Sequence, residues 1–186
     1  ASLSGATVTA NGTFTYTGQA QTPSVTVTLG GKTLAYGTEY TTGYSGNINA
    51  GTATATVTGA GNYKDSASGS FTIQPAVLTI DSVSGVQKEY DGTTQGGSAT
   101  VTFGGLKATD TLAEGTDYTI SAEFDDPGAG AGKTGTVTVT LTDTDKACNY
   151  TFADGTTAEK TFSDGVITKA AYTGTDSVAA IIGAGE

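Results

Sequence analysis

Apolar and polar residues alternate with a period of two along much of the chain. The alternation is clearest at residues 24–29 and 136–141, where Val and Leu fall on one face and Ser and Thr hydroxyls on the other. Weaker copies occupy residues 53–57, 99–103 and 118–122, each bounded by Gly, Asn or Asp turn residues. No stretch before the C-terminal tail shows a convincing helical period. The pattern therefore predicts an all-β fold of short strands closed by turns.

The same landmarks occur twice in the same order, which indicates duplicated modules. Each copy passes through a Tyr-x-Gly turn, an alternating strand, a Gly-Thr-acid-Tyr-Thr turn and an Asn-Tyr pair that follows a further strand. The paired segments are 16–18 with 90–92, 24–32 with 98–107, 37–41 with 115–119, 50–51 with 131–132, 62–63 with 149–150 and 72–76 with 166–170.

These pairings set the expected domain boundaries. The first module spans residues 1–75, the second module residues 76–169, and residues 170–186 form a tail that begins like a further module at Tyr172. We expect this tail to pack on the second module or on a neighbouring molecule. The second module is longer, and its additional residues are predicted to lengthen loops or hairpins at 124–133, 142–147 and 151–163.

Each module is predicted to bury its own alternating face. The expected core residues are Val25, Val27, Leu29 and Val57 in the first module, and Val101, Phe103, Val137, Val139 and Leu141 in the second.

Charge and hydropathy exclude several classes of partner. Eight Lys residues and no Arg face 18 acidic residues, and a net charge of -10 repels a nucleic-acid backbone. No stretch has the roughly 18 to 20 apolar residues that a membrane-spanning helix requires. Because Ala1 leads directly into patterned sequence, we expect an internal fragment of a longer protein.

The residue types present disfavour catalysis. The chain contains no His, no Trp and one Cys, so the usual pairs of nucleophile and base are missing. No pair of carboxylates is marked by its spacing as a glycosidase pair. Cys148 has no partner for an intramolecular disulfide and is expected to act as a small buried apolar residue. We therefore expect no enzyme activity and no cofactor.

Four acidic residues are the candidates for a calcium site, because calcium prefers hard oxygen ligands. Asp125, Asp126, Asp143 and Asp145 all fall in predicted loops of the second module. Their spacing matches no calcium-binding loop, so solvated acidic loops are the favoured interpretation and no metal site is assigned.

The tyrosine positions leave two readings open. Tyr63 and Tyr150 follow equivalent strands, where a tyrosine hydroxyl commonly bonds to the backbone across a sandwich corner. Tyr36, Tyr44 and Phe124 are expected to be exposed and offer an alternative glycan or protein contact. A covalent link between Lys88 and Asn149 is not favoured, because the sequence does not indicate that both are buried beside an acid.

The ordered motifs of the first module resemble the bacterial surface repeats called MBG domains. These motifs are Gln21-Thr22-Pro23, Gly37-Thr38-Glu39-Tyr40, Tyr44-Ser45-Gly46-Asn47 and Gly61-Asn62-Tyr63. The second module resembles the related YDG repeats through Lys88-Glu89-Tyr90-Asp91-Gly92. The resemblance implies two tandem immunoglobulin-like β-sandwich modules in an adhesin-like protein that is secreted, on the cell surface or attached to the bacterial cell wall. It implies no catalytic or binding residue.

Together these observations predict non-enzymatic structural repeats whose partners are neighbouring repeats of the same polypeptide. The alternative is a binding module that recognises a host glycan or protein with the loops of the second module.

Overall fold

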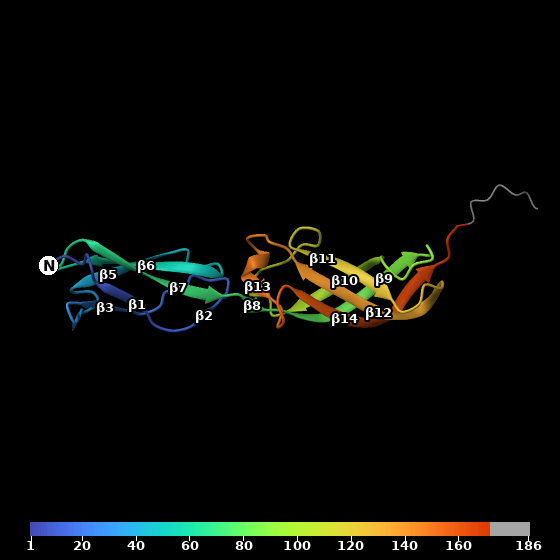
Figure 1. Ribbon diagram of the computed structural model, residues 1–186, viewed down its shortest axis with the longest axis horizontal. Coiled ribbons are helices and arrows are strands. Elements are labelled where there is room, and N and C mark those ends of the chain that lie inside the picture. The colour runs from blue at the N-terminus through green and yellow to red at the C-terminus, as the bar shows by residue number, and fades with distance from the viewer. Residues whose placement is uncertain (172–186) are drawn as a thin grey trace, which may run out of the picture. The chain divides into compact units, whose positions relative to one another are not determined.

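The computed structural model describes residues 1–171, and these residues form an all-β structure, as the alternation predicts (Figure 1). The helical element within this range is the short 3-10 turn η1 (Ala147–Asn149). The part of the predicted tail from Tyr172 onward lies outside the described residues. None of the described helices is long and apolar enough to cross a membrane.

The described chain divides into two compact units. Unit 1 comprises Ala1–Ser82, Val101–Ile120 and Thr138–Lys160. Unit 2 comprises Val83–Thr100, Ser121–Val137 and the described residues from Thr161 onward. Unit 1 therefore contains residues of both predicted modules, and the division at residue 75 stays a prediction.

The strands of the first module form two sheets, with the orders β1-β3-β4 and β2-β7-β6-β5. Most neighbours are antiparallel, but β2 and β7 are parallel. The strands are β1 (Thr7–Ala10), β2 (Phe14–Thr15), β3 (Val25–Leu29), β4 (Lys32–Thr33), β5 (Tyr40–Ser45), β6 (Gly51–Gly59) and β7 (Ser66–Gln74).

One apolar core is built from both of these sheets. Val27 of β3 and Val57 of β6 are completely buried in it, together with Leu3 from the chain start. Val25 and Leu29 are half-buried and pack against the same cluster. Along β6 the buried residues alternate with Thr residues that face outward, because successive side chains of a strand point to opposite faces.

The strands of the second module form a five-stranded sheet of order β10-β9-β14-β12-β11 and a two-stranded sheet of β13 and β8. Within this set, β9 pairs in parallel with β14, and β13 in parallel with β8. The strands are β8 (Ala76–Val77), β9 (Thr79–Glu89), β10 (Ser98–Gly104), β11 (Tyr118–Phe124), β12 (Gly130–Leu141), β13 (Tyr150–Thr151) and β14 (Thr157–Thr168).

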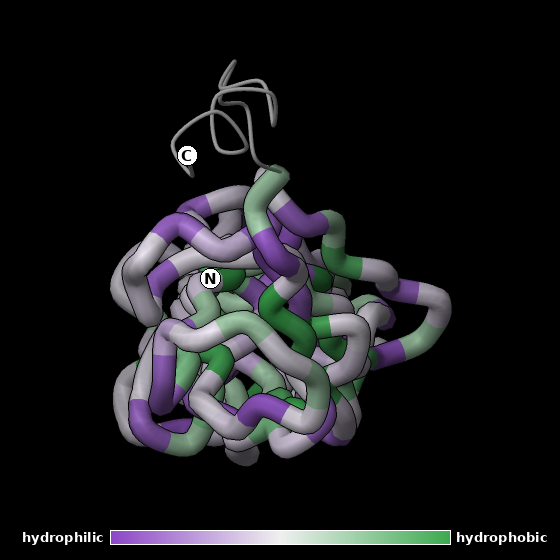
Figure 2. The backbone as a smooth tube through the Cα atoms, turned by 90° about the vertical axis from the view of Figure 1, so that its right-hand side faces the viewer, coloured by the Kyte–Doolittle hydropathy of each residue, from purple (hydrophilic) through white to green (hydrophobic). Residues whose placement is uncertain are grey.

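The expected core positions of the second module are mostly enclosed. Val101, Val137, Val139 and Leu141 are buried, whereas Phe103 is half-buried and contacts the Tyr118 ring edge-on. Figure 2 shows hydrophilic and hydrophobic residues interspersed along the backbone of the described residues. The architecture is consistent with the predicted β-sandwich fold.

Equivalent turns precede β5 and β11, and the same hydrogen bonds close both. The Gly37 amide donates to the Tyr40 carbonyl at 2.8 Å, and the Gly115 amide donates to the Tyr118 carbonyl at 2.8 Å. The acidic residue of each turn accepts a further amide: Ala35 donates to Glu39, and Ala113 donates to Asp117. The repeated sequence motif therefore folds into a repeated local structure.

Candidate functional site

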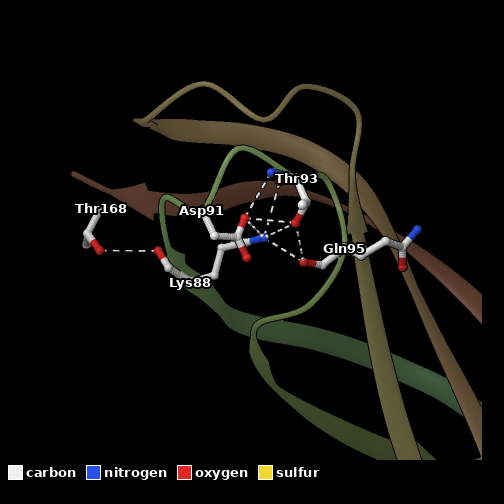
Figure 3. Close-up of polar contacts among 5 residues, drawn as sticks. All are labelled: Lys88, Asp91, Thr93, Gln95 and Thr168. Atoms are coloured by element: carbon white, nitrogen blue, oxygen red, sulfur yellow. Dashed lines mark hydrogen bonds and ion pairs between the residues drawn. The ribbon is translucent and has the colours of Figure 1, made fainter. Parts of the chain in front are cut away.

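The Lys88 ammonium group lies in an enclosed polar cluster at the end of β9 (Figure 3). Its side chain is only 6% exposed. The Nζ atom is 2.8 Å from Asp91 Oδ1, 3.0 Å from Thr93 Oγ1, 3.2 Å from the Thr93 carbonyl and 2.5 Å from the Gln95 carbonyl. We call Lys88, Asp91, Thr93 and Gln95 the lysine clasp. A buried ammonium requires such acceptors, because an unpaired charge is costly to remove from water.

Asp91 forms the other half of the clasp. Its Oδ1 atom also accepts the Thr93 amide at 2.9 Å and the Thr93 hydroxyl at 2.8 Å. The hydrogen bond from Lys88, followed by those from Thr93, holds the pKa of Asp91 well below its ordinary value. Gly92 follows with a φ of 80°, a left-handed conformation that glycine adopts without strain. The Tyr-Asp-Gly triplet therefore forms a turn closed by the lysine.

The lysine clasp lies on the parallel pair of β9 and β14. Lys88 is opposite Ile167, and Glu89 is opposite Thr168. The Thr168 hydroxyl also donates to the Lys88 carbonyl at 3.2 Å (Figure 3). The side chain of Lys88 thus holds the turn that follows β9, while the backbone of Lys88 belongs to the pair of strands β9 and β14.

The chemistry of the clasp favours a structural role. The ammonium is engaged by acceptors of its own loop. Forming an amide between Lys88 and Asp91 would require a neutral carboxyl group, whereas the lowered pKa of Asp91 favours the carboxylate. The clasp therefore orders the turn that follows β9.

A second polar cluster lies within unit 1 and centres on Asp110. The hydroxyls of Tyr16 and Tyr150 each donate to Asp110 Oδ2 at 2.7 Å. The Lys107 amide donates to the Tyr150 hydroxyl at 3.0 Å, and the two tyrosine rings meet edge-on at 5.4 Å between centroids. One carboxylate therefore joins two buried rings that are far apart in sequence.

The Asp110 cluster favours the neutral form of both tyrosines. Burial, then the hydrogen bond to Asp110, raises the pKa of Tyr16 to about 12. Burial and the same carboxylate raise the pKa of Tyr150 further above its ordinary value. A phenolate beside Asp110 would place two like charges in contact, so ionisation opposes folding.

Replacing Tyr16 with Phe is expected to flatten the dependence of the free energy of unfolding on pH in the alkaline range, so that this variant loses less stability there than the natural chain. Because the pKa of Tyr16 rises from about 10 to about 12 on folding, the folded chain retains a proton that the unfolded chain releases. This contribution is fully present below about pH 10 and is lost as the pH rises toward about 12. Urea unfolding across that interval measures it. Tyr90→Phe, in a half-exposed ring, is the control, and equal flattening in both variants would contradict the prediction.

Asn149 occupies a third polar position in unit 1. It is 4% exposed, and its Oδ1 accepts the Ala50 amide at 2.7 Å. Its Nδ2 donates to the Asp145 carbonyl at 3.1 Å. Lys88 and Asn149 are both enclosed, but each bonds to other groups, so nothing in their contacts supports a covalent link between them.

The structure uses the equivalent tyrosines Tyr63 and Tyr150 differently. Tyr150 accepts a backbone amide, as predicted for a sandwich corner. Tyr63 instead accepts a hydrogen bond from Lys32 Nζ at 3.1 Å, so the prediction is wrong for this residue. Lys32 supplies a donor close to the Tyr63 ring that the pattern of motifs does not reveal.

The calcium candidates bond to donors of the chain itself. Asp125 accepts the Thr134 hydroxyl, and Asp126 accepts the Gly128 amide and pairs with Lys133. Asp143 accepts the Cys148 thiol at 3.1 Å, and the backbone carbonyl of Asp145 accepts Asn149. Within residues 1–171, no three acidic, His or Cys side chains come together in a way that could hold a metal.

Two burial predictions are wrong. Cys148 is exposed, because it lies in η1 and directs its thiol toward Asp143. Phe124 is only 1% exposed, because it ends β11 on the inner face and packs edge-on against Phe162 at 5.2 Å. The predicted exposure is confirmed for Tyr36, which is 71% exposed, whereas Tyr44 is half-buried.

Comparison with protein families identifies one match within the chain. The YDG domain family matches residues 74–158, a range that contains the lysine clasp and Asp110. The recognition of YDG features in the second module is thereby supported, and the MBG resemblance of the first module stays a prediction. No curated protein and no solved structure matches the chain.

Proposed function

We propose, on the basis of the YDG domain at residues 74–158, that the chain consists of non-enzymatic, load-bearing repeats from a large bacterial protein. The parent protein would be secreted, displayed on the cell surface or attached to the cell wall, and adhesin-like. The repeats would hold other domains away from the surface and contact neighbouring repeats of the same polypeptide. The observation that carries this proposal is the parallel pairing of an early strand with the last strand in each module.

In the first module, Phe14 of β2 is opposite Ile73 of β7, and the Tyr16 amide extends the ladder by donating to the Gln74 carbonyl at 2.8 Å. In the second module, the β9–β14 ladder is extended in the same way, because the Tyr90 amide donates to the Thr168 carbonyl at 2.8 Å.

Parallel pairing determines how such a module resists tension. A pull on its two ends moves the early strand backward and the last strand forward along a common axis. Their hydrogen bonds are then loaded together in shear, whereas an antiparallel pair pulled apart at opposite residues opens one bond at a time. The lysine clasp lies on the loaded pair of the second module and holds the end of β9 to the following turn.

Single-molecule stretching in two directions tests this proposal. Handles at the two chain ends load the parallel pairs in shear. Handles on cysteines at positions 43 and 56, in a Cys148→Ser background, instead pull apart directly opposite residues of β5 and β6. We expect the unfolding force to be at least about twofold higher in the first geometry, because rupture under force follows the unfolding barrier. Equal forces in the two directions would contradict a load-bearing role.

The binding alternative keeps one specific observation in its favour. This observation is the exposed ring of Tyr36, which belongs to the first module, whereas Phe124, the first residue of the predicted second-module loop at 124–133, is buried.

A further inference from the structure

We propose that the first module carries a binding site for a neutral sugar, independent of the load-bearing role. A cavity of about 420 Å³ lies between the segment that enters β3 and the strand β5. Its volume is in the range of small-ligand pockets and suits one or two sugar rings. The lining residues that the argument uses are Thr22, Pro23, Ser24, Tyr36, Thr42 and Tyr44.

Tyr36 supplies a platform at this cavity. The residue is 71% exposed, and its ring meets the buried Tyr40 ring edge-on, with centroids 5.7 Å apart and planes at 68°. This contact steadies the ring through an edge and leaves most of its surface in water. A sugar ring has an apolar C–H face that can cover an aromatic ring and a rim of hydroxyls that needs polar partners. An exposed, supported tyrosine meets the first requirement.

Hydrogen bonds within the chain hold the wall of this cavity in place before any ligand arrives. The Tyr40 hydroxyl donates to the Val25 carbonyl at 2.7 Å, and the Tyr44 hydroxyl donates to the Pro23 carbonyl at 2.5 Å. The Gln21 amide donates to the Asn47 carbonyl at 2.7 Å, and the Asn47 side chain returns a bond to the Gln21 carbonyl. A preformed wall lowers the entropy cost of binding.

The chemistry of the lining selects an uncharged ligand. The chain carries 18 acidic residues and a net charge of -10, yet every residue that lines this cavity is neutral. Thr22, Ser24 and Thr42 contribute hydroxyl groups, which donate and accept hydrogen bonds as sugar hydroxyls do. A cationic peptide or an acidic sugar would find no countercharge in this lining.

The second module shows that the fold does not require an aromatic residue at this position. The turns before β5 and β11 share their hydrogen bonds, and the bridge between Tyr36 and Tyr40 recurs between Glu114 and Tyr118. Glu114 thus replaces Tyr36 in an otherwise equivalent turn. At the same offset along the chain, Ala122 replaces Tyr44. The cluster of three tyrosines is therefore specific to the first module and is not explained by the repeated turn.

Saturation-transfer NMR of the full chain with maltotriose, cellotriose, mannotriose and lactose tests this site. We expect transfer to the C–H protons of at least one sugar, with a dissociation constant on the order of 1 mM or tighter. Tyr36→Ala should weaken that binding by about tenfold or more, because it removes the platform. Tyr36→Phe, which retains the ring, should bind almost as well as the natural chain.

Glu114→Ala is the matched control, because it alters the equivalent turn of the second module and should leave binding unchanged. The exposed position of Tyr36 implies that Tyr36→Ala keeps the melting temperature of the natural chain. Absence of transfer to all four sugars would overturn the proposal, as would equal binding by Tyr36→Ala. Binding of a proline-rich peptide at Tyr36 with no sugar binding would also overturn it. None of these outcomes alters the force experiment, so the two proposals can fail separately.

Discussion

Replacing Lys88 with Met is expected to lower the free energy of unfolding by about 2–3 kcal/mol. Met retains much of the apolar stem but lacks the ammonium group, which donates hydrogen bonds to Asp91 Oδ1 and to the Gln95 carbonyl. The Lys88 side chain is 6% exposed and Asp91 is 56% exposed, so water can replace part of what the carboxylate loses. The cost therefore comes mainly from the enclosed acceptors and less from the charge pair itself.

Chemical unfolding of Lys88→Met, followed by circular dichroism, measures this loss. Lys160→Met is the control, because Lys160 is an exposed residue of β14 and its replacement should change stability by less than about 0.5 kcal/mol. Equal losses in the two variants would show that the clasp does not stabilise the fold.

The same pair predicts a dependence on acid. Because the folded chain holds the pKa of Asp91 below its ordinary value, the stabilisation is present above about pH 4 and is lost as the pH falls below it. In Lys88→Met the principal cause of the lowered pKa is absent. The stability of that variant should therefore fall less steeply between about pH 4 and pH 2 than that of the natural chain.

Replacing Gly135 with Ala is expected to cost about 3 kcal/mol of folding free energy. A Cβ atom at this position of β12 would lie 2.1 Å from the Glu123 carbonyl oxygen and 2.6 Å from Phe162 Cζ. The first contact is with backbone of the neighbouring strand β11, which cannot move without disturbing the sheet. The added methyl group of Gly135→Ala therefore strains the pairing of β12 with β11.

Thermal and urea unfolding of Gly135→Ala measure the effect, and Gly130→Ala is the control in the same strand. The nearest atom to a Cβ at Gly130 is Cε of the flexible Lys133 side chain, at 3.5 Å, so this substitution should be nearly neutral. Adding Phe162→Leu to Gly135→Ala should restore only a small part of the loss, because the carbonyl contact remains. Full restoration would show that the aromatic ring, and not the backbone, limits the space.

Much of the strand pattern could be predicted from the sequence. Val27, Val57, Val137 and Val139 are completely buried, as their alternation with Thr predicts. The alternation is a local property, because neighbouring side chains of a strand point to opposite faces whatever the strand pairs with. The equivalence of the turns at residues 37–41 and 115–119 could also be predicted, because each turn is closed within a few residues by its own amides and acidic side chain.

The wrong burial predictions concern a residue at the end of a strand and a residue in a short turn, where contacts with other parts of the chain decide burial. The sequence predicts an exposed loop at Phe124, whereas this residue ends β11 and is buried in contact with Phe162 of β14. Residue type predicts a buried Cys148, but the short turn η1 places its thiol at the surface beside Asp143. Residue type gives a tendency for burial, whereas the local turn decides the outcome for one side chain.

From the sequence alone it could be predicted that the chain is all-β, that its landmarks repeat and that particular strand residues form much of the core. Each of these features depends on residues a few positions apart or on direct comparison of two stretches of sequence. Three further features are visible only in the folded chain: Lys88 closes the Tyr-Asp-Gly turn on a strand paired with β14, Asp110 joins Tyr16 to Tyr150, and Gly135 permits close approach of β11. These contacts depend on strand pairing and on the directions of individual side chains, about which local alternation carries no information.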